Sequence, residues 1–522
     1  MPRQAREHFS DRELRLLSSM TGGGPGFYAL VGFLLAVIAW GIIAYTVQLR
    51  YGLGVTGLRD NIMWGVYITN FVFFIGVSHV GALMSAILRI TGAEWRRPIT
   101  RMAEAITFAS LLMGALMPLV DMGRPDRIPN LLLHGRLQSP ILWDMLSIAT
   151  YLTGSTLFLY VPMIPDIALL RDHFADRPNW RHRLYTILAL GWKGTDEQRR
   201  HLETVMGVLA VLIIPIAVSV HTVVSWIMGM TLRAGWNSAI FGPYFVSGAL
   251  FSGAAAVVTA MAAFRWAYRL EQYITEAHFR RMGYLVVVLG LIYAYFTFAE
   301  YLTPVYKMAA HERGYLHAVL SGQFAPLFWF TQIGGLLIPV LLLTVPRVSW
   351  VSRLREVPLL RPRPALAAAA ASVGLWIFVS ISGSPAAALE ADAIRTVIAW
   401  VVLALGGWLF VALLPVFRAR PIAAAVMASV LVDIGAWIKR FVIIVPTLQN
   451  PFLPIQRAPA GWAFYRPSWV EWSITAAALA GFALIYILFS KVFPIVSIWE
   501  TREEGVQRHA AAGGEAAHAP AP

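Results

Sequence analysis

Long apolar blocks constrain the fold of this chain more than any other feature of its sequence. They recur along all 522 residues, and each is long enough to cross the roughly 30 Å hydrocarbon layer of a membrane as a helix. Charged residues are only 13% of the chain, whereas a soluble globular domain carries about 25%. The sequence therefore predicts an all-α polytopic membrane protein.

We expect about twelve transmembrane helices. The block at 27–47 is too long for the core of a signal peptide, and no small-residue cleavage site follows it, so we interpret it as the first span. The weakest block is 365–383, because its alanine-rich start is only weakly hydrophobic. The expected spans are 27–47, 63–88, 102–120, 141–168, 203–230, 241–270, 282–306, 324–345, 365–383, 395–417, 421–446 and 469–490.

The distribution of basic residues predicts the orientation of these spans. The formal net charge is +14, and most Lys and Arg lie in the segments that face the cytoplasm if the N-terminus does so. We therefore expect a multi-pass protein of the inner (plasma) membrane with both termini in the cytoplasm. No basic run is interleaved with exposed aromatic residues, so we expect no nucleic-acid partner.

The absence of cysteine limits the redox chemistry of the chain itself. Without cysteine it holds no disulfide, no thiolate-ligated iron–sulfur cluster and no covalently attached haem c. An electron carrier would have to be a partner, a bound small molecule or a histidine-ligated haem b.

Ionisable residues inside the apolar blocks are the informative positions, because each costs roughly 2.5–3.5 kcal/mol to insert at a membrane centre. The predicted orientation places His79 near mid-depth and most of the others toward the non-cytoplasmic side. Asp121 and Asp144 lie at helix ends on that side. The residues within blocks are His79, His221, Glu300, Asp433, Lys439 and Arg440.

The helix at 63–88 has two different faces. Asn70, Ser78, Gly81 and Ser85 form a small, polar face of the kind by which membrane helices approach each other closely. We expect this face to pack against a neighbouring helix, while His79 points into a different crevice.

Simpler roles remain open for the same residues. His79 and His221 could each hydrogen-bond a neighbouring helix, or together ligate one haem b. Lys439 could extend its side chain to the membrane surface. The pair Arg124 and Asp126 could serve only to fix its loop.

Five segments carry a resemblance to a known family: 57–90, 101–127, 139–160, 433–446, and 465–474 with 489–500. They include GVSHVGALMSAILR, LVDMGRPDR and DIGAWIKRF. Through them the chain resembles the NrfD/PsrC-like (polysulfide reductase NrfD) family of quinone-interacting membrane subunits. Within it, the chain is most similar to the longer members, such as those of alternative complex III and of sulfur-metabolising redox complexes.

The resemblance implies a fold of two four-helix bundles plus additional helices. It implies a segmentation into a cytoplasmic arm, a first bundle, a basic cytoplasmic loop, a second bundle, a probable extra helix pair, C-terminal helices and a disordered tail. The corresponding ranges are 1–26, 27–170, 171–202, 203–345, 346–420, 421–500 and 501–522. The extra pair, at 365–417, departs from the family's ten-helix form.

The resemblance also implies partners and cofactors. Family members bind a quinone or quinol, either menaquinone or ubiquinone, near the outer face and hold no metal themselves. They exchange electrons with a ferredoxin-like iron–sulfur protein on that side, which can join molybdopterin or cytochrome c subunits. Polar residues at the positions of His79, Asp121, Arg124 and Asp144 lie at or near the quinone pocket or a proton path.

Quinol chemistry gives these residues distinct expected roles. Oxidation of a quinol releases two electrons and two protons, so the site needs hydrogen-bond partners for the ring oxygens and a proton exit. We expect His79 to be a hydrogen-bond partner or proton acceptor, with Asp121 and Asp144 relaying protons and Arg124 positioning them. Trp143 lies beside Asp144 at the pocket. The expected second proton path contains Glu300, Asp433, Lys439 and Arg440.

These expectations lead to a predicted function. The chain would be the quinone-reactive membrane subunit of an oxidoreductase complex, exchanging electrons with an iron–sulfur subunit and possessing a route for proton translocation. Two alternatives stay open: a secondary transporter or proton channel, and a passive membrane anchor for soluble subunits. The transporter class usually shows broken helices at matching positions of two equal halves, a pattern that this sequence does not display.

Overall fold

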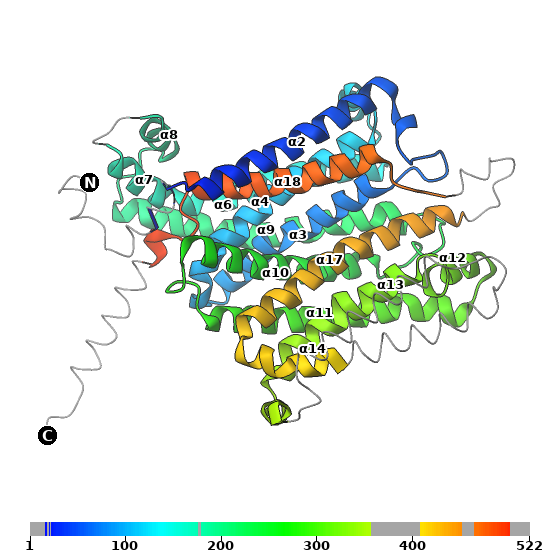
Figure 1. Cartoon of the computed structure of the whole chain (residues 1–522). Coiled ribbons are helices and arrows are strands. Elements are labelled where there is room, and N and C mark those ends of the chain that lie inside the picture. Colours follow the sequence, from blue (N-terminus) through cyan, green and yellow to red (C-terminus); the bar gives the residue numbers. More distant parts are fainter. Residues whose placement is uncertain are drawn as a thin grey trace.

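A computed structural model describes residues 22–175, 179–356, 408–451 and 464–501, together with Leu16, Leu17 and Met20. All regular structure within these residues is helical, and they contain no strand. The all-α prediction is confirmed (Figure 1).

Ten helical segments of the described chain are long and apolar enough to span a membrane. They confirm ten of the twelve expected spans. Of the other two, 365–383 lies outside the described residues, and only Trp408–Ala419 of 395–417 is described, as a shorter apolar helix. The ten are Pro25–Tyr51, Val66–Ile90, Glu94–Asp121, Pro140–His173, Asp196–Gly229, Phe241–Tyr268, Glu276–Lys307, Ala325–Arg347, Pro421–Gln449 and Trp469–Val492.

Two of these spans are interrupted. The fourth consists of α6 (Pro140–Tyr160) and α7 (Ile164–His173), joined by a 3-10 turn at Val161–Met163 that contains Pro162. The eighth consists of α13 (Ala325–Gln332), a π-helical turn (Ile333–Leu337) and α14 (Ile338–Thr344). Proline in a helix removes a backbone hydrogen bond, and π-helical turns occur frequently at functional sites.

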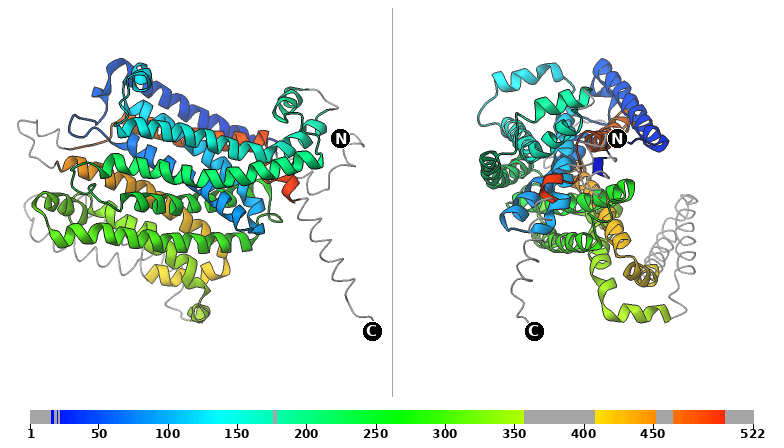
Figure 2. Two further views of the ribbon diagram at one scale, coloured as in Figure 1. Left: turned by 180° about the vertical axis from the view of Figure 1, so that it is seen from behind. Right: turned by 90° about the vertical axis from the view of Figure 1, so that its left-hand side faces the viewer.

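The spans pack as two groups of four helices with a flanking pair. In the first group α3 (Val66–Ile90), α4 (Arg97–Asp121), α6 and α9 (Asp196–Gly229) contact one another. The second contains α10 (Phe241–Tyr268), α11 (Glu276–Lys307), α13–α14 and α17 (Pro421–Gln449). Helices α10 and α17 both touch α3 and so join the groups, while α2 (Pro25–Tyr51) lies along α18 (Trp469–Val492) (Figures 1 and 2). The segment boundaries expected from the resemblance stay a prediction.

Helix α3 is the centre of the packing, and its small face makes the close contacts expected of it. A Cβ added at Gly81 would lie 1.9 Å from the carbonyl oxygen of Ala103 on α4. Asn70 donates to Thr475 on α18 (2.9 Å) and accepts from the indole of Trp437 on α17 (2.8 Å). The expected packing of this face is confirmed.

The helices have two chemically different ends. Helix α2 begins, and α18 ends, at what we call the basic end, where the arginine-containing segments 89–101, 171–175, 179–200, 265–281 and 418–420 also lie. We call the other one the opposite end. Its short helices include α5 (Ile128–Leu133) and α12 (Ala310–Leu320), whereas α8 (Trp180–Leu188) lies at the basic end.

A buried ion pair fixes the segment after α18 at the basic end. Arg101 on α4 donates to Asp166 on α7 at 2.5 Å, and both side chains are buried. Asp166 also accepts hydrogen bonds from the backbone N–H groups of Ile498 (3.1 Å) and Trp499 (2.9 Å). One carboxylate therefore ties three separate segments together.

Candidate functional site

The histidine of α3 meets the histidine of α9 in the interior of the first group. The ring centroids of His79 and His221 are 4.5 Å apart, with an edge-to-face orientation, and the two side chains are 0% and 1% exposed. Tyr151 on α6 completes the cluster, with its ring centroid 5.1 Å from that of His79. The sequence indicated both histidines individually but did not reveal that they touch.

Both ring nitrogens of His79 face carbonyl oxygens. Nδ1 lies 2.6 Å from the oxygen of Ile75, and Nε2 lies 2.7 Å from that of Ala217. A neutral imidazole can donate only one of these hydrogen bonds, whereas an imidazolium donates both. His79 therefore lies where gaining or losing a proton changes its hydrogen bonds to two helices.

This geometry bears on the haem alternative. An axial ligand must offer a lone pair to iron, but each nitrogen of His79 is already directed at a backbone oxygen within hydrogen-bond distance. The arrangement does not fit axial ligation by His79. Nδ1 of His221 is covered by protein and has no hydrogen-bond partner among the described residues, so that nitrogen is available to a small ligand or a water.

Asp144 lies on the same face of α6 as Tyr151, two turns away. The buried residues of this helix include Asp144, Ile148, Tyr151 and Ser155, a helical periodicity that places them on one side. Asp144 is buried, and its Oδ1 has no partner among the described residues. A buried polar atom normally has a partner, so this oxygen has an unfilled place for a hydrogen-bond donor.

Trp143, the neighbour of Asp144, faces the other way. Its side chain is about half exposed, and its indole N–H donates to the carbonyl oxygen of Leu137 at 2.6 Å. This position suits contact with the membrane interface or with the edge of a bound ring.

An apolar groove lies between α6 and α9, on the side of α6 away from Asp144 and Tyr151. Its volume is about 490 Å³, within the range of roughly 300–1,000 Å³ for small-molecule sites. The wall on α9 ends at Ile216, next to Ala217, whose carbonyl oxygen contacts His79. The groove is lined by Ala149, Thr150, Thr153, Gly154, Leu157, Leu209, Leu212, Ile213 and Ile216.

Asp121 belongs to a second polar cluster at the opposite end. It closes α4 and is partly exposed, although its Oδ1 is covered and unpaired among the described residues. Beside it, Gln48 donates to the carbonyl oxygen of Val120 (2.8 Å) and accepts from the hydroxyl of Tyr67 (2.6 Å). The interior glutamine and tyrosine were not singled out from the sequence.

Glu471 is a further acid that sequence reasoning missed. It accepts hydrogen bonds from the hydroxyl of Tyr465 (2.5 Å) and from the backbone N–H groups of Gly57 (2.7 Å) and Ser468 (2.8 Å). Burial raises the pKa of the Tyr465 hydroxyl, and the charge of Glu471 raises it further. The signal was present, because Ser468 and Glu471 form a capping box, S-x-x-E, at the start of α18.

Arg124 contacts a different acid from those that it was expected to position. It makes a two-point ion pair with Asp126, at 3.0 Å and 2.8 Å, in an exposed loop. These hydrogen bonds lower the pKa of Asp126. No described contact joins Arg124 to Asp121 or Asp144, so the loop-fixing alternative accounts for its geometry.

Lys439 on α17 is enclosed by aromatic rings. Its Nζ donates to the hydroxyl of Tyr301 at 3.1 Å and lies 4.7 Å, 5.3 Å and 5.8 Å from the ring centroids of Tyr301, Phe328 and Tyr244. The side chain is buried at 3% exposure. The alternative in which Lys439 extends to the surface is therefore wrong, because the helices of the second group cover it.

Acids and tyrosines continue this cluster toward the opposite end. Glu300 on α11 accepts from the hydroxyl of Ser238 at 2.6 Å, and the hydroxyls of Tyr301 and Tyr315 are 3.5 Å apart. Burial raises the pKa of Tyr315 to about 12. Glu312 on α12 is also buried, with Oε2 unpaired among the described residues.

Arg440 connects the two helix groups at mid-depth. It donates to Ser252 (3.0 Å) and to the carbonyl oxygen of Ala436 (2.9 Å). A Cβ at Gly76 of α3 would lie 2.7 Å from its Nη2. Asp433, one turn from Ala436, accepts from Thr259 at 3.3 Å and forms no described ion pair with Arg440, in agreement with their spacing on the helix.

A small cavity joins Lys439 to Arg440. It has a volume of about 10 Å³, enough for about one water molecule, and it abuts the π-helical turn at Gly335. Its walls include Tyr293, Gln332, Lys439 and Arg440. Of the four residues expected in the second path, Lys439 and Arg440 line this cavity. Glu300 precedes Tyr301, the hydrogen-bond partner of Lys439, and Asp433 lies on the same helix as Lys439.

The family of the chain can be stated from comparison with known proteins. The family model described as "Polysulphide reductase, NrfD" matches residues 54–357. The chain belongs to the NrfD family. This match includes His79, Asp121, Asp144, His221 and Glu300, while α17 and α18 lie beyond it.

Three curated proteins are similar to this NrfD-family chain. A putative membrane subunit of the dimethyl sulfoxide reductase of Halobacterium salinarum is 28% identical over 63% of this chain and 72% of its own length. A selenate reductase subunit of Mesobacillus selenatarsenatis is 27% identical, over 62% and 75%. An Hdr-like menaquinol oxidoreductase integral membrane subunit of Archaeoglobus fulgidus is 22% identical, over 64% and 74%.

Proposed function

We propose that this protein is the quinone-interacting membrane subunit of a multi-subunit oxidoreductase complex. Its family and the similar reductase and menaquinol oxidoreductase subunits support a role in a redox complex. The observation that carries the proposal is the unpaired carboxylate oxygen of Asp144, on the face that holds Tyr151 against His79. An apolar groove lies between α6 and α9 on the opposite side of α6.

The residues fit the demands of a quinol. The groove between α6 and α9 offers apolar walls for an isoprenoid tail, and Asp144, on the other side of α6, offers an acceptor for a hydroxyl proton. His79 can hold a proton between two carbonyl oxygens, and the unpaired Nδ1 of His221 offers a second acceptor. Electrons would pass to a ferredoxin-like iron–sulfur subunit at the opposite end, joined in the complex by molybdopterin or cytochrome c subunits.

The proposal includes a location and two proton routes. The protein would lie in the plasma membrane with the basic end in the cytoplasm, as the positive-inside rule favours. Asp144 and Asp121 would release protons at the opposite end. Glu300, Lys439 and Arg440, with the cavity between the last two, would form a second route through the second helix group.

The direct test is turnover of the assembled complex. We expect His79→Gln to lower quinol:acceptor activity by about 10²–10⁴-fold, the usual contribution of a positioned acid or base. Asp172→Asn is the matched control, since Asp172 forms an exposed ion pair with Arg171 at the basic end. Unchanged turnover in a complex that retains all its subunits would remove His79 from the mechanism.

The second route has its own test. Lys439→Met keeps a long side chain among Tyr301, Phe328 and Tyr244 but removes the ammonium group. We expect electron transfer to continue while proton uptake or release by complex-containing vesicles, measured with a pH-sensitive dye, falls. Full proton movement in this variant would remove Lys439 from the route.

A further inference from the structure

A basic pocket lies at the basic end of the second helix group, away from the residues discussed so far. Three segments meet there: the start of α11, the turn at Val345–Arg347 that follows α14, and the link between Phe417 and Pro421. Its volume is about 410 Å³. Its walls are Glu276, Phe279, Arg280, Tyr284, Leu342, Leu343, Pro346, Arg347, Phe417, Arg418, Pro421 and Ala424.

The arginines of this pocket come from different elements, and contacts of the guanidinium group fix two of them, Arg418 and Arg347. Arg418 donates through Nη1 to the carbonyl oxygens of Pro346 (3.0 Å) and Val348 (2.6 Å). The guanidinium of Arg347 lies over the ring of Tyr284, 4.5 Å from its centroid. A guanidinium has five N–H donors. The described hydrogen bonds of Arg418 use only Nη1, so the N–H groups of its other nitrogens can donate to a ligand.

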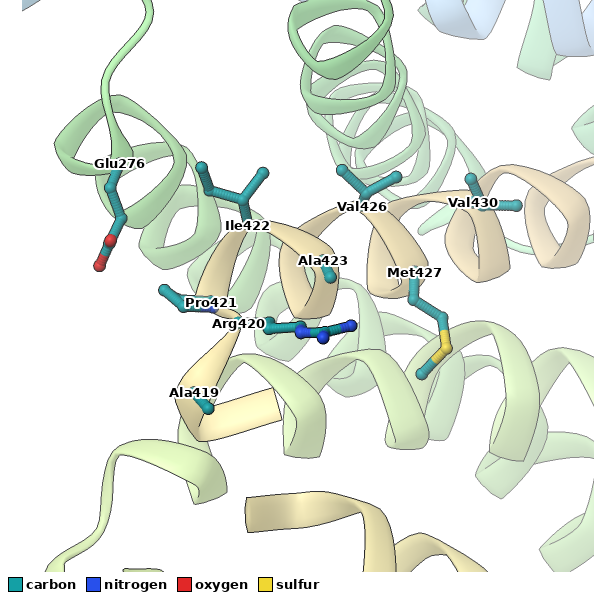
Figure 3. A pocket seen from close by; sticks show the side chains of 9 residues that line it. All are labelled: Glu276, Ala419, Arg420, Pro421, Ile422, Ala423, Val426, Met427 and Val430. Atoms are coloured by element: carbon teal, nitrogen blue, oxygen red, sulfur yellow. The ribbon is translucent and has the colours of Figure 1, made fainter. Parts of the chain in front are cut away.

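An apolar groove adjoins this pocket and shares Glu276 and Pro421 with it. Its volume is about 810 Å³, and Figure 3 shows it along the first turns of α17, with the side chain of Arg420 beside Ala423. The remaining walls are Ala419, Ile422, Ala423, Val426, Met427 and Val430. From Ile422 to Val430 the groove follows α17 into the membrane for about 12 Å, at about 1.5 Å per residue.

We propose that the pocket and groove together bind one anionic phospholipid, with its phosphate at Arg280, Arg347 and Arg418 and an acyl chain along α17. Arg280, Arg347, Arg418 and Arg420 line the two cavities against the single carboxylate of Glu276. Arginine matches phosphate geometry through paired N–H donors. Basic pockets between helices on the cytoplasmic side are typical sites for anionic headgroups.

The combination of a basic pocket and an apolar groove favours an anionic phospholipid over a free anion or a zwitterionic lipid. A free anion would fill the basic pocket but gain nothing from the groove, whereas a zwitterionic lipid would fill the groove but bring no net negative charge to the arginines. Only a lipid with a net negative headgroup uses both. Such a lipid would also bridge α11 to the link before α17, because the pocket walls come from both.

The test is lipid binding to the detergent-solubilised full-length protein. Dioleoyl phosphatidylglycerol, dioleoyl phosphatidylcholine and inorganic phosphate are titrated separately, and bound molecules are counted by native mass spectrometry. The principal variant is the pair Arg280→Gln with Arg347→Gln, which leaves the backbone contacts of Arg418 intact. The matched control is Arg183→Gln with Arg199→Gln, two exposed arginines of the basic end outside this pocket.

We expect the principal variant to bind phosphatidylglycerol about 25-fold more weakly, since each basic residue near an anionic headgroup contributes roughly 5-fold. Arg280→Lys with Arg347→Lys keeps both positive charges and should retain most of the affinity for phosphatidylglycerol. This variant tests whether the protein still folds when both arginines are replaced. The control pair and the binding of phosphatidylcholine should not change.

A substitution in the groove distinguishes a bound lipid from a bound soluble anion. Ala423→Trp fills the groove outside the lining of the basic pocket, and it should weaken phosphatidylglycerol binding while leaving any binding of inorganic phosphate as it was. Equal phosphatidylglycerol affinity in wild type and in the principal variant would overturn the proposal. An unaltered phosphatidylglycerol affinity in Ala423→Trp would also overturn it. The occupant would then be a soluble anion in the basic pocket alone, or the groove would be taken by residues 357–407 of the chain.

Discussion

The imidazoles of His79 and His221 are in edge-to-face contact, with their centroids 4.5 Å apart, on two helices that are distant in sequence. Two positive charges at this separation repel strongly in an apolar interior. The pair therefore holds at most one positive charge, which is one proton more than the two neutral rings carry. A site that takes quinol protons in successive single steps would need such a pair to empty before it accepts the next proton.

The first prediction concerns the coupling of these histidines. If they act as one unit, His79→Gln and His221→Gln should each lower kcat/KM for quinol strongly, and the double variant should lose little more than the worse single variant. Groups that act together show this non-additivity. The measurement is steady-state turnover of the three assembled variants. If the loss in the double variant equals the product of the two single losses, the histidines act independently and the prediction is wrong.

The second prediction concerns Asp144. Its Oδ1 is covered and unpaired among the described residues, and an unsatisfied buried group costs about 1–3 kcal/mol. We expect Asp144→Leu to unfold at a higher temperature than wild type in detergent, while quinol turnover falls at least tenfold. Asp126→Asn, in the exposed loop pair with Arg124, should change neither. A variant that loses stability as well as activity would assign Asp144 a structural role.

The helices were the part most readily predicted from sequence. The block 27–47 is apolar around the whole helix, and the length of such a block alone sets a span. The breaks inside spans were not predicted. At the π-helical turn the chain approaches α17 closely, since a Cβ at Gly335 would lie 2.8 Å from Cα of Gly435 on that helix. Hydropathy does not encode such a contact.

The site was predicted residue by residue but not as a geometry. Helical spacing indicated that His79 and Asn70 face different neighbours, but it did not identify them as α9 for His79 and as α17 and α18 for Asn70. Nearness in sequence also misled, because Arg124 pairs within its own loop instead of with Asp121. The burial of Lys439 depends on rings from α10, α11 and α13, which no local pattern reveals.

The third prediction tests the small face of α3. A Cβ at Gly81 would lie 1.9 Å from the carbonyl oxygen of Ala103 and 2.1 Å from the hydroxyl of Thr107, so α3 and α4 would have to separate. We expect Gly81→Ala to destabilise the protein by about 1–3 kcal/mol, as overpacking does. Gly32→Ala on α2 is the control, because nothing lies within 4 Å of its added Cβ. Thermal unfolding in detergent should separate the two variants, and equal midpoints would refute the close contact.

The fourth prediction concerns the carboxylate that fixes the segment after α18. Asp166 is fully buried, pairs with Arg101 and accepts backbone hydrogen bonds from Ile498 and Trp499. Breaking a buried ion pair leaves an uncompensated charge and costs about 3–5 kcal/mol, so Asp166→Ala should lower the unfolding midpoint markedly. It should also expose the chain around Trp499 to proteolysis in otherwise intact protein. Asp172→Ala removes only an exposed pair, and the expected cost is at most about 1 kcal/mol. If both variants resist protease as wild type does, the segment is held by its apolar contacts instead of by Asp166.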